Sequence, residues 1–340
     1  MARRRRAVRA VTATLVAGIL AAACGSPAST GPTSTGPAGN AGSARVSGTA
    51  DVAYAGSLQL LNDTVLGPAF AKSTGAAYEG RGAGALGLSK EIASGEITPN
   101  VFESIGSAPI TALEPRFTTW YVQVAASPLV VAYNPDSPDG PELSRIAKGA
   151  RPLSDLFTLM ASPGFLLGRT DPSTDPQGQA FYEMVELAQT VLHLPPGTAG
   201  KVLGPPSNPA QIFAETALES RLEAGQLDAA SAFLSQAVQL HLHYIALPAT
   251  IDFGDPSLAG AYAKAHVALA GGQTVHGVPL VVDVTTLGRT DPAAAAAFVA
   301  GLLSPSGRAA FRSAGYQLLP PAVLGQVSAV PAVVRRALEG

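Results

Sequence analysis

Residues 77–104 read AYEGRGAGALGLSKEIASGEITPNVFES, and this stretch decides the fold class. A short strand is predicted at 77–79, followed by a glycine-rich turn at 80–85. A helical pattern of apolar residues follows at 86–93, and a second short strand at 101–104. A strand, a turn, a helix and another strand at this spacing are typical of a parallel βαβ unit. The chain is therefore predicted to be an α/β protein.

The same alternation of strands and helices continues on both sides of this stretch. Strands are predicted at 51–54, in two pieces within 120–135 broken at 126–128, and at 165–168, 244–248 and 278–284. Helices are predicted at 58–73, after Pro152, and at 179–194, 210–224, 229–240, 293–303 and 305–314, the last two closing the chain. About 290 residues of this kind are enough for one large domain or two lobes.

Three predicted turns share one physical design, in which small residues lead into the first turn of a helix. They are Gly56–Ser57, Gly84–Ala85 and Asp175–Gly178. The first N–H groups of a helix have no internal acceptor, and the helix dipole places partial positive charge there. Several such helix starts that converge on a cleft bind an oxyanion without lysine or arginine. One such turn alone is weak evidence, because helix caps are common.

The beginning of the chain has the pattern of an export signal. Five arginines precede an apolar run at 11–23 that ends at the only cysteine, Cys24. The run is shorter than the roughly 20 apolar residues that span a bilayer. Leu20–Gly25 resembles a bacterial lipobox, with Ala21 at the position where leucine is more usual. The alternative is an ordinary secretory signal that leaves Cys24 as an unmodified thiol.

The next residues predict a tether. Residues 25–48 consist almost entirely of Gly, Ser, Thr, Pro and Ala, and such a segment buries too little apolar surface to fold. We therefore predict a signal peptide at 1–23 and a lipidated Cys24 that begins a flexible tether at 24–48. The folded domain would work outside the cytoplasm, held at the cell membrane by lipid alone.

Charge and composition exclude several classes of partner. Removing the five arginines of residues 1–23 from 22 basic residues leaves 17, against 24 acidic residues, a net charge of about −7. An acidic chain argues against nucleic acid and against docking on anionic lipid. His241 and His243 are the only clustered histidines and have no third ligand nearby in sequence, so no metal and no cofactor is expected. Ser57 lies outside a G-x-S-x-G elbow, which disfavours a secreted serine hydrolase.

Longer motifs lie in a recognisable order along the chain: Tyr54–Leu58, Trp120–Tyr121, Leu129–Tyr133, Asp171–Gly178, Leu222–Asp228, Tyr244–Pro248, Ile251–Pro256, Gly277–Pro279 and Phe298–Phe311. They resemble the substrate-binding proteins of molybdate/tungstate ABC transporters, which have the type II periplasmic-binding-protein fold. The resemblance covers about residues 52–321. It implies a monomeric binding protein, not an enzyme, that captures a small tetrahedral oxyanion and delivers it to an ABC permease.

The resemblance also implies the architecture and the ligand-binding residues. Two lobes, each a mainly parallel sheet flanked by helices, would comprise 49–132 plus 283–340 and 133–282, with crossings near 131–133 and 280–284. They would close on the ligand by a hinge motion. The residues implied to bind the ligand are Ser57, Gly84, Ala85, Ala126, Ser127 and Asp175. Ser57 would donate its hydroxyl and N–H, and Asp175 would lie at a helix start of the second lobe.

Two positions depart from the family pattern. Ala85 stands where the family often has serine, which removes one side-chain donor. One branch of the family completes six-coordinate molybdate or tungstate with two carboxylates; Asp175 matches the first, whereas the second falls near Ala232. The choice between molybdate and tungstate is open. So are two alternatives: a receptor for another small solute such as sulfate, phosphate or an organic acid, and a surface module without a ligand.

Overall fold

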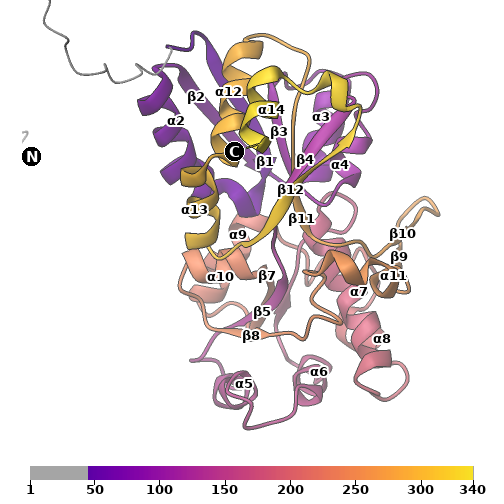
Figure 1. Ribbon diagram of the computed structural model, residues 1–340. Helices are drawn as coiled ribbons and strands as arrows, with labels where there is room; N and C mark the ends of the chain where they lie inside the picture. The colour runs from indigo at the N-terminus through magenta and orange to yellow at the C-terminus, as the bar shows by residue number, and fades with distance from the viewer. Residues whose placement is uncertain (1–44, 340) are drawn as a thin grey trace, which may run out of the picture. The chain divides into compact units, whose positions relative to one another are not determined.

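The computed structural model describes residues 45–339, in which a six-stranded sheet collects strands from distant parts of the chain (Figure 1). The strand order is β12–β4–β11–β3–β1–β2. The bounds are β1 (Thr49–Ala55), β2 (Ala77–Ala83), β3 (Val101–Ile105), β4 (Trp120–Ala126), β11 (Val281–Thr286) and β12 (Gln317–Gly325). The predicted signal peptide, Cys24 and most of the predicted tether lie outside the described residues.

A second sheet of four strands has the order β6–β7–β5–β8. Its strands are β5 (Leu129–Tyr133), β6 (Leu167–Gly168), β7 (Ala229–Phe233) and β8 (Tyr244–Ala246). A separate hairpin pairs β9 (His266–Ala268) with β10 (Thr274–His276). The residues of 129–133 are all buried, since β5 is an inner strand that the helices Pro176–Val191 and Leu234–Gln239 also contact.

Helices cover both faces of the six-stranded sheet. The neighbouring residues Ala53 and Tyr54 of β1 point to opposite faces, and both are therefore buried. Helix α3 contacts β1 and β3, and α12 contacts β1 and β11. The helices here are η1 (Gly56–Leu58), α1 (Gln59–Leu61), η2 (Asn62–Leu66), α2 (Gly67–Thr74), α3 (Ala85–Ser94), α4 (Ala108–Thr111), α12 (Pro292–Leu303), α13 (Pro305–Ser313), η4 (Val327–Ala329) and α14 (Ala332–Glu339).

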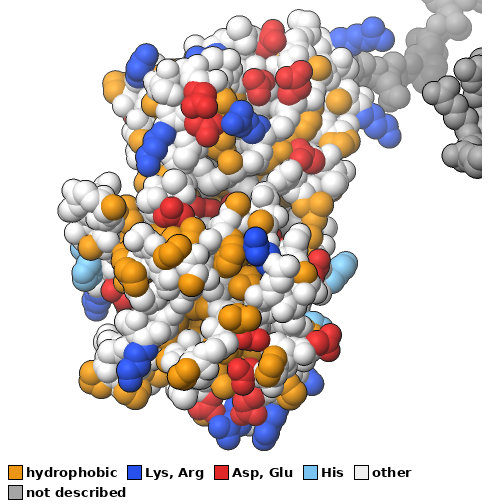
Figure 2. Space-filling model, turned by 180° about the vertical axis from the view of Figure 1, so that it is seen from behind, with side chains coloured by type: hydrophobic (Ala, Val, Ile, Leu, Met, Phe, Trp, Pro, Cys, Tyr) orange, Lys and Arg blue, Asp and Glu red, His pale blue; other side chains and the backbone are white. Residues whose placement is uncertain are grey.

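The four-stranded sheet has its own helices, of which α7, α9 and α10 contact β7. They are α5 (Gly140–Ala147), α6 (Ser154–Met160), α7 (Pro176–Val191), α8 (Thr198–Leu203), α9 (Glu215–Glu223), α10 (Leu234–Gln239), η3 (Pro256–Leu258) and α11 (Ala259–Tyr262). Within residues 45–339 no helix is both long and apolar enough to cross a membrane. Acidic and basic side chains are interspersed over the face in Figure 2.

The sheets are mixed, and the prediction of mainly parallel sheets is wrong in this respect. Strand β1 pairs in parallel with β2 and β3, but β11 is antiparallel to β3 and β4, and β12 is antiparallel to β4. In the smaller sheet only β6 and β7 are parallel. Parallel neighbours need a crossover connection, whereas β11 enters from the other sheet and is free to run the opposite way.

The chain changes sheets twice. Strand β4 ends at Ala126 in the large sheet and β5 begins at Leu129 in the small one, so the first change falls at 127–128. The small sheet ends with β8, the chain then forms the separate β9–β10 hairpin, and it enters the large sheet again at β11 through residues 277–280. Both changes lie a few residues before the predicted crossings. The lobe boundaries at 132/133 and 282/283 stay predictions.

The prediction of one helix over 229–240 is wrong. Residues 229–233 form β7, and α10 begins at Leu234. All five residues of β7 are buried between β5 and β6, and sheet pairing there overrides the helix propensity of its three alanines. The chain also does not close with the helix at 305–313, because β12 and α14 follow.

Asp283 is an unusual residue of the large sheet. It lies on β11 next to an irregularity in the pairing with β4, is 1% exposed, and neither carboxylate oxygen has a hydrogen-bond partner among the described residues. Burial raises the pKa of Asp283 to about 8, and only the side chain of Gln123 acts in the opposite direction. The folded protein therefore holds a proton at Asp283 that the unfolded chain releases at a lower pH.

This proton gives the stability a defined pH dependence. Between pH 5 and pH 8 the wild-type protein should lose stability as the pH rises, because only the folded state keeps the proton. Asp283→Asn removes this term, so its free energy of unfolding relative to wild type should rise by up to about 1.4 kcal/mol per pH unit. Urea unfolding at several pH values measures it. The control is Asp136→Asn at an exposed position, whose free energy of unfolding should change with pH as that of wild type does. If Asp283→Asn also showed the wild-type dependence on pH, the expectation would be wrong.

Candidate functional site

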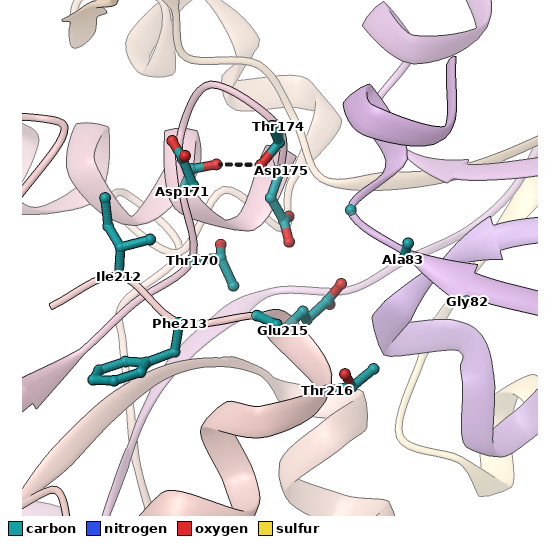
Figure 3. Close-up of a pocket in the computed structure, with 12 residues that line it drawn as sticks. Gly82, Ala83, Thr170, Asp171, Thr174, Asp175, Ile212, Phe213, Glu215 and Thr216 are labelled. Carbon is teal, nitrogen blue, oxygen red and sulfur yellow. Dashed lines mark hydrogen bonds between the residues drawn. The ribbon is translucent and has the colours of Figure 1, made fainter. Parts of the chain in front are cut away.

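A cavity of about 360 Å³ lies where segments attached to the two sheets meet. The large sheet contributes the end of β2 and the start of α3, and the rest comes from the segments before α7 and α9 (Figure 3). It is lined by Gly82–Gly84, Thr170, Asp171, Thr174, Asp175 and Ile212–Thr216. A second cavity, of about 330 Å³, shares Thr216 and reaches Gly56, Ser57 and Glu219. Among the described residues, no lysine or arginine lines either cavity.

The Gly56–Ser57 turn follows β1 and approaches Glu215 closely. A Cβ atom on Gly56 would lie 2.5 Å from Glu215 Oε2, so a larger residue at this position would displace the Glu215 carboxylate. Ser57 is 3% exposed, and its Oγ lies beside the Glu215 carboxylate without meeting hydrogen-bond geometry. The Ser57 carbonyl accepts a hydrogen bond of 3.1 Å from the Tyr316 hydroxyl. The predicted Ser57 turn is therefore at the cleft, with a carboxylate against it.

The Gly84–Ala85 turn also approaches the second sheet's segments. Gly84 precedes α3, and a Cβ atom there would lie 2.7 Å from the carbonyl oxygen of Thr174. That oxygen accepts a hydrogen bond of 3.1 Å from the backbone N–H of Gly87. Gly84 lines the larger cavity, whereas Ala85 is fully buried beneath it. A donor of this helix start is thus engaged by a protein carbonyl.

The predicted pair Ala126 and Ser127 lies deeper, at the first change of sheet. Both residues are fully buried, and neither lines the two cavities. The Ser127 N–H donates to the carbonyl of Leu280 at 2.9 Å, and its hydroxyl lies 2.9 Å from that of Ser235. Their role toward a ligand stays a prediction.

Asp175 is the N-cap of α7. Its Oδ1 accepts a hydrogen bond of 2.8 Å from the backbone N–H of Gln177, and Pro176 occupies the first helical position. Asp and a following Pro are the local signals of a helix start, which is why the sequence placed this residue well. Asp175 is 5% exposed, and burial raises its pKa to about 6 although the Gln177 N–H favours the charged form.

Glu215 is the site residue that the sequence analysis missed. It is the first residue of α9, 5% exposed, and its Oε2 has no hydrogen-bond partner among residues 45–339. The carboxylates of Asp175 and Glu215 point into the same space in Figure 3. Burial, and then the charges of Asp175 and Glu219, raise the pKa of Glu215 well above its ordinary value. A glutamate in the first turn of a helix is common, so no sequence signal marked it.

Buried amides connect the acids. Gln236 Nε2 donates to Glu219 Oε1 at 2.8 Å and to Glu215 Oε1 at 3.4 Å. Gln177 Nε2 donates to Gln236 Oε1 at 2.9 Å, and the Ser231 hydroxyl donates to Gln177 Oε1 at 2.8 Å. Residues of α7, β7, α9 and α10 thereby share one polar network next to the cavity.

Arg169 is a fully buried positive charge next to the lining residue Thr170, although it does not itself line the cavity. Its guanidinium donates to neutral oxygens only: the side chain of Gln211 at 3.1 Å and the carbonyls of Pro205, Pro206 and Thr170 at 3.1, 2.9 and 3.4 Å. Asp171 is the carboxylate whose charge acts on Arg169, without a hydrogen bond between them, and the guanidinium contributes a favourable potential to an anion nearby.

The alternatives to an anion site find little support in this geometry. No histidine of residues 45–339 lines either cavity, so Ser57 has no imidazole base beside it there. Within the described part of the chain no three His, Cys, Asp or Glu side chains converge as ligands for a metal ion. Glycine turns, helix starts and two acids surround these cavities.

Known proteins of similar sequence include solute receptors. A Haloferax volcanii protein, described as a candidate molybdenum-binding protein of an ABC transporter, is 32% identical over 270 residues, which cover 79% of this chain and 82% of that protein. The molybdate/tungstate-binding protein WtpA of Pyrococcus abyssi is 28% identical over 234 residues, 63% of this chain and 66% of WtpA.

Solved structures confirm the predicted two-lobe periplasmic-binding-protein fold. The periplasmic molybdate-binding protein of Azotobacter vinelandii superposes with a TM-score of 0.52 at 18% identity, covering 81% of this chain and all of that one. The sulfate-binding protein SubI of Mycobacterium tuberculosis gives 0.50 at 12% identity, with 87% and 91% covered. Residues 50–317 match the family model of bacterial extracellular solute-binding proteins, which spans most of the described chain. The chain therefore belongs to the bacterial extracellular solute-binding protein family.

Proposed function

We propose that this protein is the solute-binding component of an ABC importer and captures molybdate or tungstate in the cavity between its two sheets. The observation that carries the proposal is the pair of buried acids, Asp175 and Glu215, that faces the helix starts in a cavity whose described lining has no basic side chain. The names of similar proteins, a molybdenum-binding and a molybdate/tungstate-binding protein, support the same solute class.

The two acids discriminate between classes of oxyanion. A carboxylate about 4 Å from a negative charge costs on the order of 4 kcal/mol at an effective dielectric constant near 20. Sulfate and phosphate have no further coordination position at their central atom, so they meet this repulsion without compensation. Molybdenum(VI) and tungsten(VI) accept additional oxygen ligands, so Asp175 and Glu215 would bind the metal centre and convert repulsion into coordination.

Glu215 would replace the carboxylate that the resembling branch carries at position 232. Ala232 lies on β7 and packs in a small apolar cluster with Leu218 and Leu222 of α9. The first turn of the same helix carries Glu215. The chain would therefore supply its second carboxylate from α9 instead of β7, to the same space.

The remaining features of the predicted receptor are part of the proposal. Lobes of 49–132 plus 283–340 and 133–282 would close on the solute, and Ser57, Gly84, Ala85, Ala126 and Ser127 would contribute polar or backbone groups around it. The tether beginning at lipidated Cys24 would hold a monomeric protein at the outer face of the cell membrane. Transport requires no chemistry on the solute, so no enzymatic activity is proposed.

Solute selectivity is the first expected outcome. Molybdate or tungstate should raise the melting temperature of the purified protein, because a ligand that binds only the folded state stabilises by about 2.7 kcal/mol at 100 times its dissociation constant. Sulfate and phosphate at the same concentrations should leave it unchanged. A shift with sulfate or phosphate alone would overturn the assignment to metal oxyanions, and no shift with any of the four would overturn the proposed solute class.

Moving the carboxylate tests the role of Glu215. Glu215→Ala should weaken tungstate binding at least about tenfold, or 1.4 kcal/mol, in isothermal titration calorimetry. The variant should be at least as stable as wild type, because it removes a buried acid without a full set of partners. Adding Ala232→Glu should restore part of the affinity, since it returns a carboxylate to the same region.

The matched control for this experiment is Glu223→Ala, which removes an exposed acid from the same helix. It should bind tungstate as wild type does. Wild-type affinity in Glu215→Ala would exclude Glu215 as a ligand, and failure of Ala232→Glu to restore binding would show that the origin of the carboxylate matters.

A further inference from the structure

Gln236 is held in one orientation by the backbone. The N–H of Phe233 donates to Gln236 Oε1 at 2.9 Å, and an N–H group has no acceptor function, so the atom that faces it is the amide oxygen. The Gln236 NH₂ group must therefore point the other way. The fold thus decides the direction of this amide without reference to any side chain.

The neighbouring amide agrees with this orientation. Gln177 Nε2 donates to the same Gln236 oxygen, which leaves Gln177 Oε1 to accept from the hydroxyl of Ser231 at 2.8 Å. Gln177 also donates its backbone N–H to Asp175. Each donor meets an acceptor, so the chain of hydrogen bonds has a single consistent direction that runs from Ser231 to the acids.

The Gln236 NH₂ group is the last donor in this series of hydrogen bonds. Its Nε2 lies 2.8 Å from Glu219 Oε1 and 3.4 Å from Glu215 Oε1, the two acids of α9. An amide N–H donates only to a lone pair, so it favours the unprotonated oxygen of each carboxyl group. Glu215 has its Oε1 on this side, and its other oxygen, Oε2, is the one that faces Gly56 and has no partner among the described residues.

The charges around these acids oppose ionisation. Asp175 faces Glu215 from the start of α7, and Glu223 acts on Glu219 from their own helix. Tyr316 lies against the other side of the cleft, where it hydrogen-bonds Ser57. Burial, with Glu223 and Asp175 adding to it, raises the pKa of Glu219 to about 7. Gln236 is the only side chain that donates a hydrogen bond to both acids in the part of the chain that the structure describes.

We propose that Gln236 is a positioning residue, whose amide holds Glu215 and Glu219 by one oxygen each and thereby keeps the second oxygen of Glu215 turned toward the Gly56–Ser57 turn, where the proposed solute would reach it. The inference rests on the proposed function for the identity of the solute, but not for the hydrogen bonds. It assigns solute affinity to a residue that does not line the cavity of Asp175 and Glu215.

A purely structural role for Gln236 makes a different expectation. Gln236 is the N3 residue of α10 and caps the Phe233 N–H, and glutamate serves this function as well as glutamine. Gln236→Glu therefore keeps the cap and the acceptor for Gln177 but removes the NH₂ donor. A capping role alone predicts a loss of affinity no larger than the added negative charge causes, and no effect of Ser231→Ala, which adds no charge. Positioning predicts an effect of both variants.

The experiment measures tungstate affinity of wild type and Gln236→Glu by calorimetry at pH 5.5, 7.0 and 8.5. At pH 8.5 the variant should bind at least tenfold more weakly, because a third carboxylate replaces the donor. The difference should narrow toward pH 5.5, where the introduced carboxyl group is protonated and again supplies a donor. Gln226→Glu, which adds the same charge at an exposed position of the same lobe, should follow the wild-type profile.

A readout without ligand separates this inference from the proposed function. In carbon-13 NMR titrations of carboxyl-labelled protein, the pH midpoints at which Glu215 and Glu219 titrate should rise in Gln236→Glu. In Gln226→Glu they should equal the wild-type midpoints. Unchanged midpoints and unchanged affinity would overturn the positioning role. If the wild-type protein binds no metal oxyanion, the proposed function fails while the titration still decides the role of Gln236.

Ser231→Ala provides a second variant should Gln236→Glu fold poorly. It leaves the cap of α10 intact and removes only the hydroxyl that fixes Gln177. The midpoint of Glu215 should move in the same direction by a smaller amount, since Gln177 loses its fixed orientation. No movement of either acid in this variant would contradict a directed chain of hydrogen bonds.

Discussion

The approach of Glu215 to the Gly56–Ser57 turn is the contact on which the rest of the site depends. It joins a helix of the small sheet to the end of the first strand of the large one. A Cβ at position 56 would lie 2.5 Å from the carboxylate and would displace it. Gly84 makes the same allowance for the Thr174 carbonyl. Two glycines thus set how closely the two halves meet around the cavity.

Because the two halves meet closely here, two carboxyl groups are buried near each other, and the surrounding groups offset only part of the free-energy cost. Asp175 and Glu215 are buried together, and no basic side chain of residues 45–339 lines their cavity. A backbone N–H at α7, the amide of Gln236 and the distant charge of Arg169 oppose the cost of burial. The proposed solute, a metal oxyanion, would offer its metal centre to the carboxylates and its oxygens to the helix starts, and would thereby complete the balance.

Much of the fold was predictable because its signals are local. The strands and helices between residues 49 and 105 follow the expected pattern, and Asp175 was placed correctly by the Asp-Pro start of α7. The strand at residues 229–233 was not predicted, because a short alanine-rich segment has no hydrophobic periodicity. Its conformation follows from burial between two strands. The antiparallel pairing of β11 and β12 was equally invisible, since strand direction depends on where the chain returns from the other sheet.

The sequence by itself determined the α/β alternation and the helix start at Asp175, because each depends on residues within a few positions of one another. It also determined the family resemblance, because the order of motifs along the chain can be seen without the fold. Only the tertiary structure decided which acid joins Asp175. Ser57 and Glu215 are far apart in the chain, and a glutamate at a helix start looks the same whether it caps the helix or faces a ligand. The pairing of such residues follows from how the two sheets pack, which no local pattern of hydrophobic and polar residues encodes.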